Sequence, residues 1–171
     1  MSKISKVIHV GGLDATLTRK CFLPPNMIFS LEAVSLMETA NEDARRFGRK
    51  SIGLDHLFLA VSTLSAASIA FGRQNVPFDR PLAHMEKMIQ TGNETADTKE
   101  LPLNDIAEEV IRLAEAFAGN SRDKLILPFH ILKAVAKTAV DMPRCSVALL
   151  FRQLEIAPIR FFQDVSECED L

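Results

Sequence analysis

An acidic residue stands directly beside a histidine at Asp55-His56, and acid–base chemistry uses these two residue types. A carboxylate next to an imidazole can orient a proton or bind a cation. The pair also fits the start of a helix, where the helix dipole favours a carboxylate and the histidine packs inward. The structural interpretation is favoured, because helix caps are common and catalytic pairs are rare.

The other histidines and the cysteines show no spacing typical of a metal site. His9, His84 and His130 are isolated in the sequence. The three cysteines lie far apart without a CxxC spacing, which fits reduced thiols better than a disulfide framework or a zinc site. Cys21 is a nucleophile only if the fold supplies a base. We therefore expect no catalytic residue, no metal and no cofactor.

The composition is that of a single globular domain, with 171 residues, 47% hydrophobic and 25% charged. The net charge is -2, so nucleic acid is not an expected partner, and a DNA-binding helical protein would need a recognition helix rich in Arg and Lys. No stretch approaches the roughly 20 apolar residues of a membrane span. Residues 1–10 lack the apolar core of a secretory signal. We expect a cytoplasmic protein; an organelle stroma fits if a transit peptide has been removed.

Helical periodicity dominates the chain after residue 28. One buried stripe is formed by Ala33, Met37, Ala40 and Ala44, which are three or four residues apart. Ser30 suits the cap of this helix, and Gly48 suits its end. Further helices are predicted at about 55–63, 66–74, 128–138 and 145–154, with others beginning near 78 and 158. No strand alternation interrupts them, so the predicted fold class is all-α.

Three segments lie outside this pattern. Residues 1–28 are predicted to be an N-terminal extension, with a short strand at 7–10 and two prolines that block a helix before Ser30. Residues 91–100 are polar and predict a linker. Residues 164–171 are predicted to be an acidic, mobile tail.

The chain contains the same pattern of residues twice, 74 positions apart. The matching pairs include Ser30 and Asn104, Ala33 and Ala107, Met37 and Ile111, Ala40 and Ala114, and Ala44 and Ala118. From about residue 71 the offset becomes 80, so the second copy has about six extra residues near 139–144. Copies several helices long usually stack into one core. We therefore expect repeat 1 at about 29–90 and repeat 2 at about 101–163.

Two runs in the first copy resemble the Clp N-terminal repeat. Thr39–Gly48 matches the family pattern A-x-E-E-A-R-x-L-G, and Ile52–Ala60 matches I-G-T-E-H-L-L-L-A. The resemblance covers about residues 29–163. It implies a compact domain of two four-helix repeats related by a pseudo-two-fold axis. No G-x-x-x-x-G-K-S/T loop occurs, so the chain resembles a stand-alone Clp-N protein without ATPase modules; the alternative is an excised domain of a longer unfoldase.

The resemblance implies a non-enzymatic protein-binding module. Its expected role is that of an adaptor or regulator of an ATP-dependent Clp chaperone–protease, with a Clp-type AAA+ unfoldase, a Clp peptidase or protein substrates as partners. The alternative is an independent receptor for phosphoarginine-bearing or unfolded protein segments. A third class is a small hydrolase or redox enzyme that uses Cys21 or His56, but no motif in the sequence supports it.

The resemblance also implies a ligand pocket. In some members the acid of G-T-E-H and a Thr or Ser at the start of the long helix bind phosphoarginine; the matching residues here are Asp55 and Ser30. A carboxylate can pair with the guanidinium, while a hydroxyl and amides hold the phosphate. Leu54 replaces the family threonine, and Phe129 stands where the second copy would need its acid. At most one such pocket is therefore implied.

Adjacent opposite charges mark the outer face of the first predicted helix: Glu42, Asp43, Arg45 and Arg46. They form either an ordinary solvated face or a docking surface for a partner. Phe78, Phe161 and Phe162 are apolar candidates for partner contact, and each of them also fits a core position.

Overall fold

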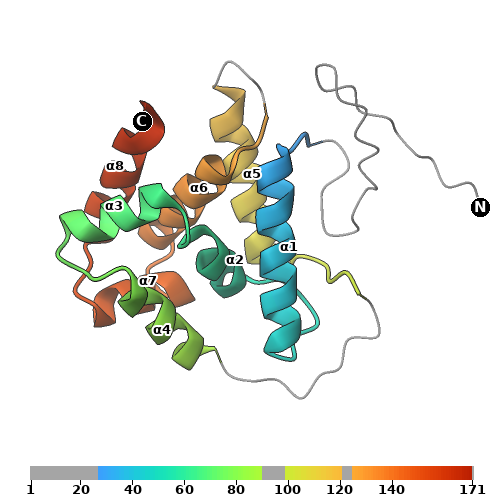
Figure 1. The fold of residues 1–171 in the computed structure, drawn as a ribbon, viewed down its shortest axis with the longest axis horizontal. Helices are drawn as coiled ribbons and strands as arrows, with labels where there is room; N and C mark the ends of the chain where they lie inside the picture. Colours follow the sequence, from blue (N-terminus) through green and yellow to red (C-terminus); the bar gives the residue numbers. More distant parts are fainter. Residues whose placement is uncertain (1–26, 90–98, 121–124, 171) are drawn as a thin grey trace, which may run out of the picture.

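The computed structural model describes residues 27–89, 99–120 and 125–170, which form eight α-helices and one short 3₁₀ helix (Figure 1). The first half contains α1 (Leu31–Arg46), α2 (Leu54–Val61), α3 (Ser65–Arg73) and α4 (Asp79–Met88). The second half contains α5 (Asp105–Gly119), α6 (Pro128–Asp141), α7 (Ser146–Gln153), α8 (Pro158–Ser166) and the 3₁₀ helix η1 (Glu167–Asp170). The all-α prediction is confirmed. The predicted strand at 7–10 and most of the predicted linker lie outside the described residues.

Both long helices begin at a polar side-chain cap, which is Ser30 as predicted and Asn104 at the matching position 74 residues later. The Ser30 side chain accepts a hydrogen bond from the backbone N–H of Ala33 at 3.1 Å, and Asn104 accepts one from Ala107 at 2.9 Å. Each cap satisfies an amide that has no partner within its helix. Two different residue types thus perform the same task at equivalent positions of the two copies.

The two copies are joined by reciprocal backbone contacts. Phe29 forms an isolated parallel bridge with Ile126, and Leu103 forms one with Ile52. Adding 74 to Phe29 gives Leu103, and adding 74 to Ile52 gives Ile126, so each bridge is the symmetry equivalent of the other. This reciprocity agrees with a pseudo-two-fold relation between the repeats.

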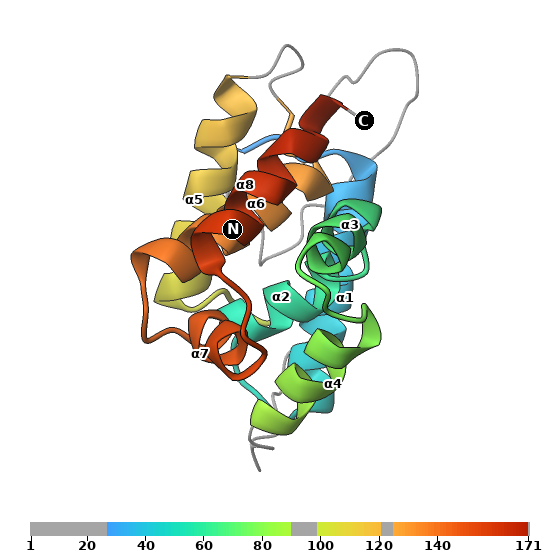
Figure 2. The ribbon, with the colours of Figure 1, turned by 90° about the vertical axis from the view of Figure 1, so that its left-hand side faces the viewer.

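Figures 1 and 2 show how the helices are arranged around this junction. Helices α2 and α6 pack against each other in the middle, with α1 and α5 on one side of them. On the other side α3 packs on α8, and α4 packs on α7. Each of these outer pairs takes one helix from each repeat. The repeats therefore share one core.

A cluster of phenylalanines fills the centre of that core. Phe71 and Phe151 are equivalent residues, and their rings meet edge-on with centroids 6.5 Å apart. Phe161 lies against both rings, at 4.7 Å from Phe71 and 4.8 Å from Phe151. Phe58 is a further member, 6.1 Å from Phe151. Contacts between aromatic rings, most of them edge-to-face here, add to the stabilisation that burial of the rings provides.

The extra residues of the second copy lengthen a helix. Helix α2 has 8 residues, whereas its equivalent α6 has 14. The difference of six residues accounts for the change of offset from 74 to 80. The insertion therefore adds more than one turn to α6 and leaves the repeat core in register.

The end of the chain differs from the expected acidic tail. Helix α8 runs to Ser166, so the segment 164–171 begins inside a helix, where Asp164 and Val165 are buried. Arg73 of α3 pairs with Glu167 at 2.7 Å and with Asp164 at 3.4 Å. These contacts hold the end of α8 against the first repeat.

No single helix among the described residues is long and apolar enough to cross a membrane. Helices α2 and α3 together meet the length and composition requirement, but they are bent by 92°.

The turns after α3 and α7 are equivalent in the two copies, and each contains one residue in the left-handed backbone conformation. Asn75 and Glu155 both have a φ of 58°, which asparagine tolerates better than glutamate. We expect Glu155→Asn to raise the free energy of unfolding by about 0.5–1 kcal/mol, and the reciprocal change Asn75→Glu to lower it by a similar amount. Urea denaturation of both variants measures this. Two variants as stable as the wild type would contradict the prediction.

Candidate functional site

The Asp55-His56 pair lies at the start of α2. The buried imidazole of His56 accepts a hydrogen bond at Nδ1 from the backbone N–H of Gly53, at 2.9 Å. Asp55 Oδ1 lies 3.5 Å from the same nitrogen. The other ring nitrogen, Nε2, is buried and has no hydrogen-bond partner among the described residues. The histidine therefore closes the first turn of its helix and does not face solvent.

The second copy repeats this arrangement. His130 Nδ1 accepts a hydrogen bond from the backbone N–H of Leu127 at 3.1 Å, at the start of α6. His130 stands 74 positions after His56, and this spacing is the sequence signal that links the two residues. A residue that performs the same capping task in both copies is part of the framework, which favours the structural interpretation of His56 over a catalytic one.

The surroundings of His56 keep it neutral. Burial lowers the pKa of His56 below its ordinary value of 6.5; Asp55 and Asp43 act in the opposite direction, and Arg49 adds to the lowering. A neutral ring is also what the hydrogen bond requires, because Nδ1 must offer its lone pair to the Gly53 amide.

The structure places the two predicted pocket residues in different surroundings. Ser30 is at the start of α1, where its backbone N–H bonds to Ile126, and no hydrogen bond or ion pair joins it to Asp55. A β-carbon added to Gly53 would lie 2.6 Å from Asp55 Oδ1 and 3.1 Å from the Asn104 side-chain nitrogen. The polar cap beside Asp55 is therefore Asn104 of the other repeat.

The predicted charged surface is partly occupied by contacts within the chain. Arg46 bonds to Glu86 of α4 at 2.7 Å and to Asp43 at 3.1 Å, and its guanidinium lies 4.7 Å from the Phe47 ring centroid. Arg46 therefore ties α1 to α4, while Asp43 pairs with Arg46 within α1. Glu42 and Arg45 are exposed beside them.

The three apolar candidates differ in exposure. Phe78 is 39% exposed, as expected for a surface residue. Phe161 is only 1% exposed, so its assignment to a partner surface is wrong; it belongs to the central ring cluster. Phe162 is half-buried, with its ring near that of Phe117. The stripe period alone does not distinguish the inner from the outer member of the Phe161-Phe162 pair.

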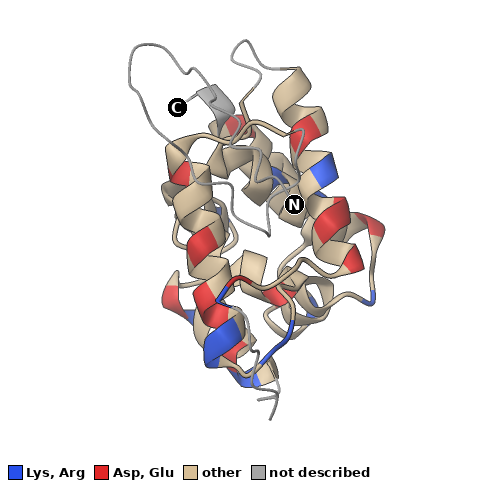
Figure 3. Cartoon of the chain, turned by 90° about the vertical axis from the view of Figure 1, so that its right-hand side faces the viewer, with Lys and Arg blue, Asp and Glu red and all other residues tan. Residues whose placement is uncertain are grey.

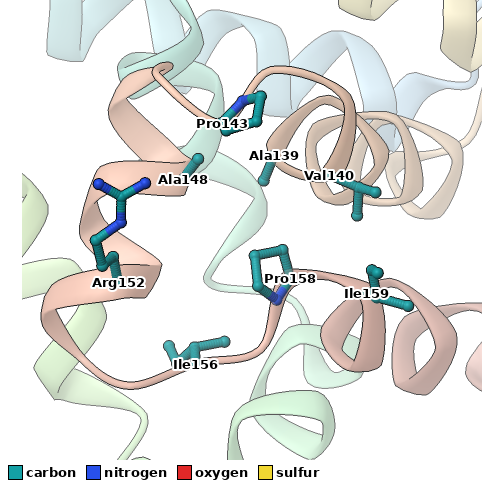
Figure 4. A pocket seen from close by; sticks show the side chains of 8 residues that line it. All are labelled: Ala139, Val140, Pro143, Ala148, Arg152, Ile156, Pro158 and Ile159. Carbon is teal, nitrogen blue, oxygen red and sulfur yellow. The ribbon is translucent and has the colours of Figure 1, made fainter.

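The structure also contains a groove that the sequence did not reveal. Its volume is about 350 Å³, and the end of α6, α7 and the start of α8 enclose it (Figure 4). Its walls are mainly apolar and include Ala139, Val140, Ala148, Pro158 and Ile159. Among the described residues, Arg152 is the only charged one that lines it. We call this the repeat-2 groove. The six-residue insertion was its signal, because the lengthened α6 forms one wall.

Comparison with known families identifies the fold. The model of the Clp repeat (R) N-terminal domain matches residues 28–142, about two thirds of the chain. The chain belongs to the Clp N-terminal domain family. The Clp N-terminal domain is a protein-interaction module and not a catalytic one.

Solved structures support the same fold for this Clp N-terminal domain. The Hsp104 N-terminal domain from Candida albicans superposes with a TM-score of 0.68 at 16% identity, covering 82% of this chain and 91% of that one. The N-terminal domain of the caseinolytic protease-associated chaperone ClpD from Arabidopsis thaliana gives 0.61 at 15% identity, covering 86% and 100%. A protein from a malarial secretion system gives 0.64 at 13% identity, covering 81% and 92%. No curated protein gives a significant match to the sequence.

The two cysteines that the structure describes in this Clp N-terminal domain are buried and form hydrogen bonds within it. Cys145 is buried at the cap of α7, where its sulfur accepts from Ala148 N–H at 3.4 Å, and burial raises the pKa of its thiol. Cys168 is buried against the backbone of Asp164. Within the described ranges no three His, Cys, Asp or Glu side chains could hold a metal ion. His9 and Cys21 lie outside those ranges.

Figure 3 shows acidic and basic residues mixed on the face that it presents.

The lowered pKa of His56 predicts a pH effect on stability. As pH falls below 6.5, the unfolded chain binds a proton that the folded domain resists, so this residue lowers the free energy of unfolding in acid and has no such effect above pH 7. His56→Asn keeps an acceptor near Gly53 and does not titrate. We expect stability to change less between pH 7.5 and 5.5 in the variant than in the wild type, by urea denaturation at both values. An equal change in the free energy of unfolding between the two pH values, in the variant and in the wild type, would show that burial of the imidazole does not disfavour its charged form.

Proposed function

We propose that this protein is an adaptor or regulator of an ATP-dependent Clp chaperone–protease. In this role it docks on an unfoldase or peptidase subunit, or on protein substrates, through exposed faces of its helices. The observation that carries the proposal is the family match over residues 28–142. The proposal places the protein in the compartment of its Clp partner, either the cytoplasm or an organelle stroma.

Apolar side chains on the outer faces support a docking role. Ile28 and Leu31 are exposed at the start of α1, and Leu31 is 57% exposed. The cap at Ser30 and the bridge at Phe29 fix the backbone between them. Exposed apolar residues on a rigid backbone bind a partner at a small cost in conformational entropy.

A second candidate is an independent receptor for phosphoarginine-bearing or unfolded segments. The observation that favours it is the placement of Asp55 beside Asn104, at the N-terminus of α5. A carboxylate there could pair with a guanidinium, while the first amides of the 15-residue helix favour a phosphate.

The adaptor proposal predicts direct binding to a Clp component. We expect the purified protein to bind a purified Clp unfoldase or peptidase from its source, and to change ATPase or proteolytic rates at least two-fold at saturation. Leu31→Glu should weaken binding if the start of α1 is the docking face, because it places a charge in an apolar contact. Arg112→Glu, at an exposed position of α5, is a control variant on a separate helix. The proposal fails if the wild type neither binds a Clp component nor alters its activity.

The receptor candidate predicts a different pattern. A phosphoarginine peptide should bind the wild type, and Asp55→Ala should weaken it about ten-fold because the guanidinium loses its carboxylate. Ser30→Ala should leave the affinity unchanged, since Ser30 does not contact Asp55. Isothermal titration with peptides carrying phosphoarginine or arginine measures this. Binding that depends on Ser30 and not on Asp55 would contradict this placement of the pocket.

A further inference from the structure

The repeat-2 groove is a feature of one copy in a duplicated framework. Helix α2 ends at Val61, so the first repeat lacks the wall that the lengthened α6 supplies. At the offset of 80, Ala148 corresponds to Ser68, and Ile159 corresponds to Asp79. Polar residues thus replace apolar ones at two positions. The groove is therefore not a by-product of the repeat fold.

The groove combines apolar walls with positive charge. Ala148 and Arg152 are four residues apart and share one face of α7, so the guanidinium stands at the edge of the apolar surface (Figure 4). The residue equivalent to Arg152 in the first copy is Gly72. An apolar surface bordered by one cation can hold apolar side chains and select for a nearby carboxylate.

Two further arginines adjoin the groove along the chain. Arg144 follows the lining residue Pro143, and Arg160 follows the lining residue Ile159; both are exposed. Neither of them, nor Arg152, forms an ion pair within the described part of the chain. These three arginines can therefore pair with the carboxylates of a bound partner.

The nearby acids compensate this charge only in part. Asp141, at the end of α6, is bound by Lys137. Glu155 is exposed in the turn after α7 and has no ion-pair partner among the described residues. Three arginines in or directly beside the lining segments, against one acid without an ion-pair partner, give these segments a net positive charge, and this excess determines the partner chemistry.

Exposed apolar residues extend the surface beyond the groove. Ile159 is 62% exposed, and Met142 and Leu149 are also exposed beside the segments that form the walls. The volume of about 350 Å³ accommodates one or two large side chains, since whole ligand sites occupy about 300–1,000 Å³. The surface therefore suits a short segment of a protein chain that inserts apolar side chains and carries acids beside them.

We propose that the repeat-2 groove docks a protein segment in which apolar residues alternate with aspartate or glutamate. The apolar side chains enter the groove between α6, α7 and α8, while Arg152, Arg144 and Arg160 attract the carboxylates. This inference rests on the proposed role as a protein-binding module and specifies one site and the partner chemistry.

The test uses three fluorescein-labelled 12-residue peptides with the same leucines, and with Glu, Gln or Lys at every other position. Fluorescence anisotropy with the full chain measures binding at 50 and 300 mM NaCl. We expect the Glu peptide to bind about five-fold more tightly than the Gln peptide at low salt, and the Lys peptide to bind weakest. The preference for Glu should shrink at high salt, because salt screens exposed charges.

Variants assign the binding to the groove. Arg152→Glu should remove the preference for the Glu peptide, and Arg152→Lys should retain most of it. Ile159→Asp should weaken all three peptides; it introduces the residue type found at the equivalent position of α4, and an acid early in a helix is favourable to folding. Arg80→Glu is the matched control, since exposed Arg80 is the counterpart of Arg160 on the first repeat and should leave the affinities unchanged.

Several outcomes would overturn the proposal. These are equal affinity for the Glu and Gln peptides, insensitivity to both Arg152→Glu and Ile159→Asp, or an equal loss in Arg80→Glu. Concentration-dependent dimerisation that Ile159→Asp abolishes would assign the groove to a second copy of the chain instead. The peptide assay contains no Clp subunit. If the peptides do not bind but a Clp component does, only the groove proposal is rejected. If the peptides bind but no Clp component does, only the adaptor role is rejected.

Discussion

The structure depends on an exchange of backbone hydrogen bonds between the two halves of the chain. The N–H of Ser30 bonds to the carbonyl of Ile126 at 3.0 Å, and Asn104 bonds to Ile52 at 2.9 Å. Ile126 and Ile52 return bonds to residues 28 and 102, each at 2.8 Å. A buried polar group left without a partner costs about 1–3 kcal/mol. Neither half alone supplies these partners, and the central α2–α6 pair and the ring cluster likewise combine residues of both copies.

Local signals predicted much of this architecture. The cap at Ser30 and the stripe of Ala33, Ala40 and Ala44 each depend on a few neighbouring residues, and both occur where expected; the match of Ser30 to Asn104 carries the cap over to the second copy. The bridges between the copies were not predicted, because no residue type marks one isolated backbone pair. The same limit applies to Arg46, whose charge suggested a free surface but whose partner Glu86 lies 40 residues away in the sequence.

The candidate sites were harder to predict than the fold. Asp55 was singled out by a family pattern, but its polar neighbour Asn104 comes from the other repeat, and only the three-dimensional packing shows this. The structural interpretation of His56, which the sequence already favoured, gains support because the equivalent His130 accepts the same kind of hydrogen bond at the start of α6. The groove depends on which side of the fold the inserted residues lie. The sequence shows that six residues are inserted, but it does not show where they lie relative to α7 and α8.

The exchange of backbone bonds also sets an order for folding during synthesis. Ile52 leaves the ribosome 74 residues before Ile126, its equivalent in the second copy, which completes the paired bridges. At about 5–20 residues per second, that interval is on the order of 4–15 s. During that time Phe58 and Phe71 lack the rings of Phe151 and Phe161 that cover them in the finished core. The apolar side chains of the first half thus lack their partners during synthesis, and the domain can fold cooperatively only after the segment that contains Phe151 and Phe161 has been made.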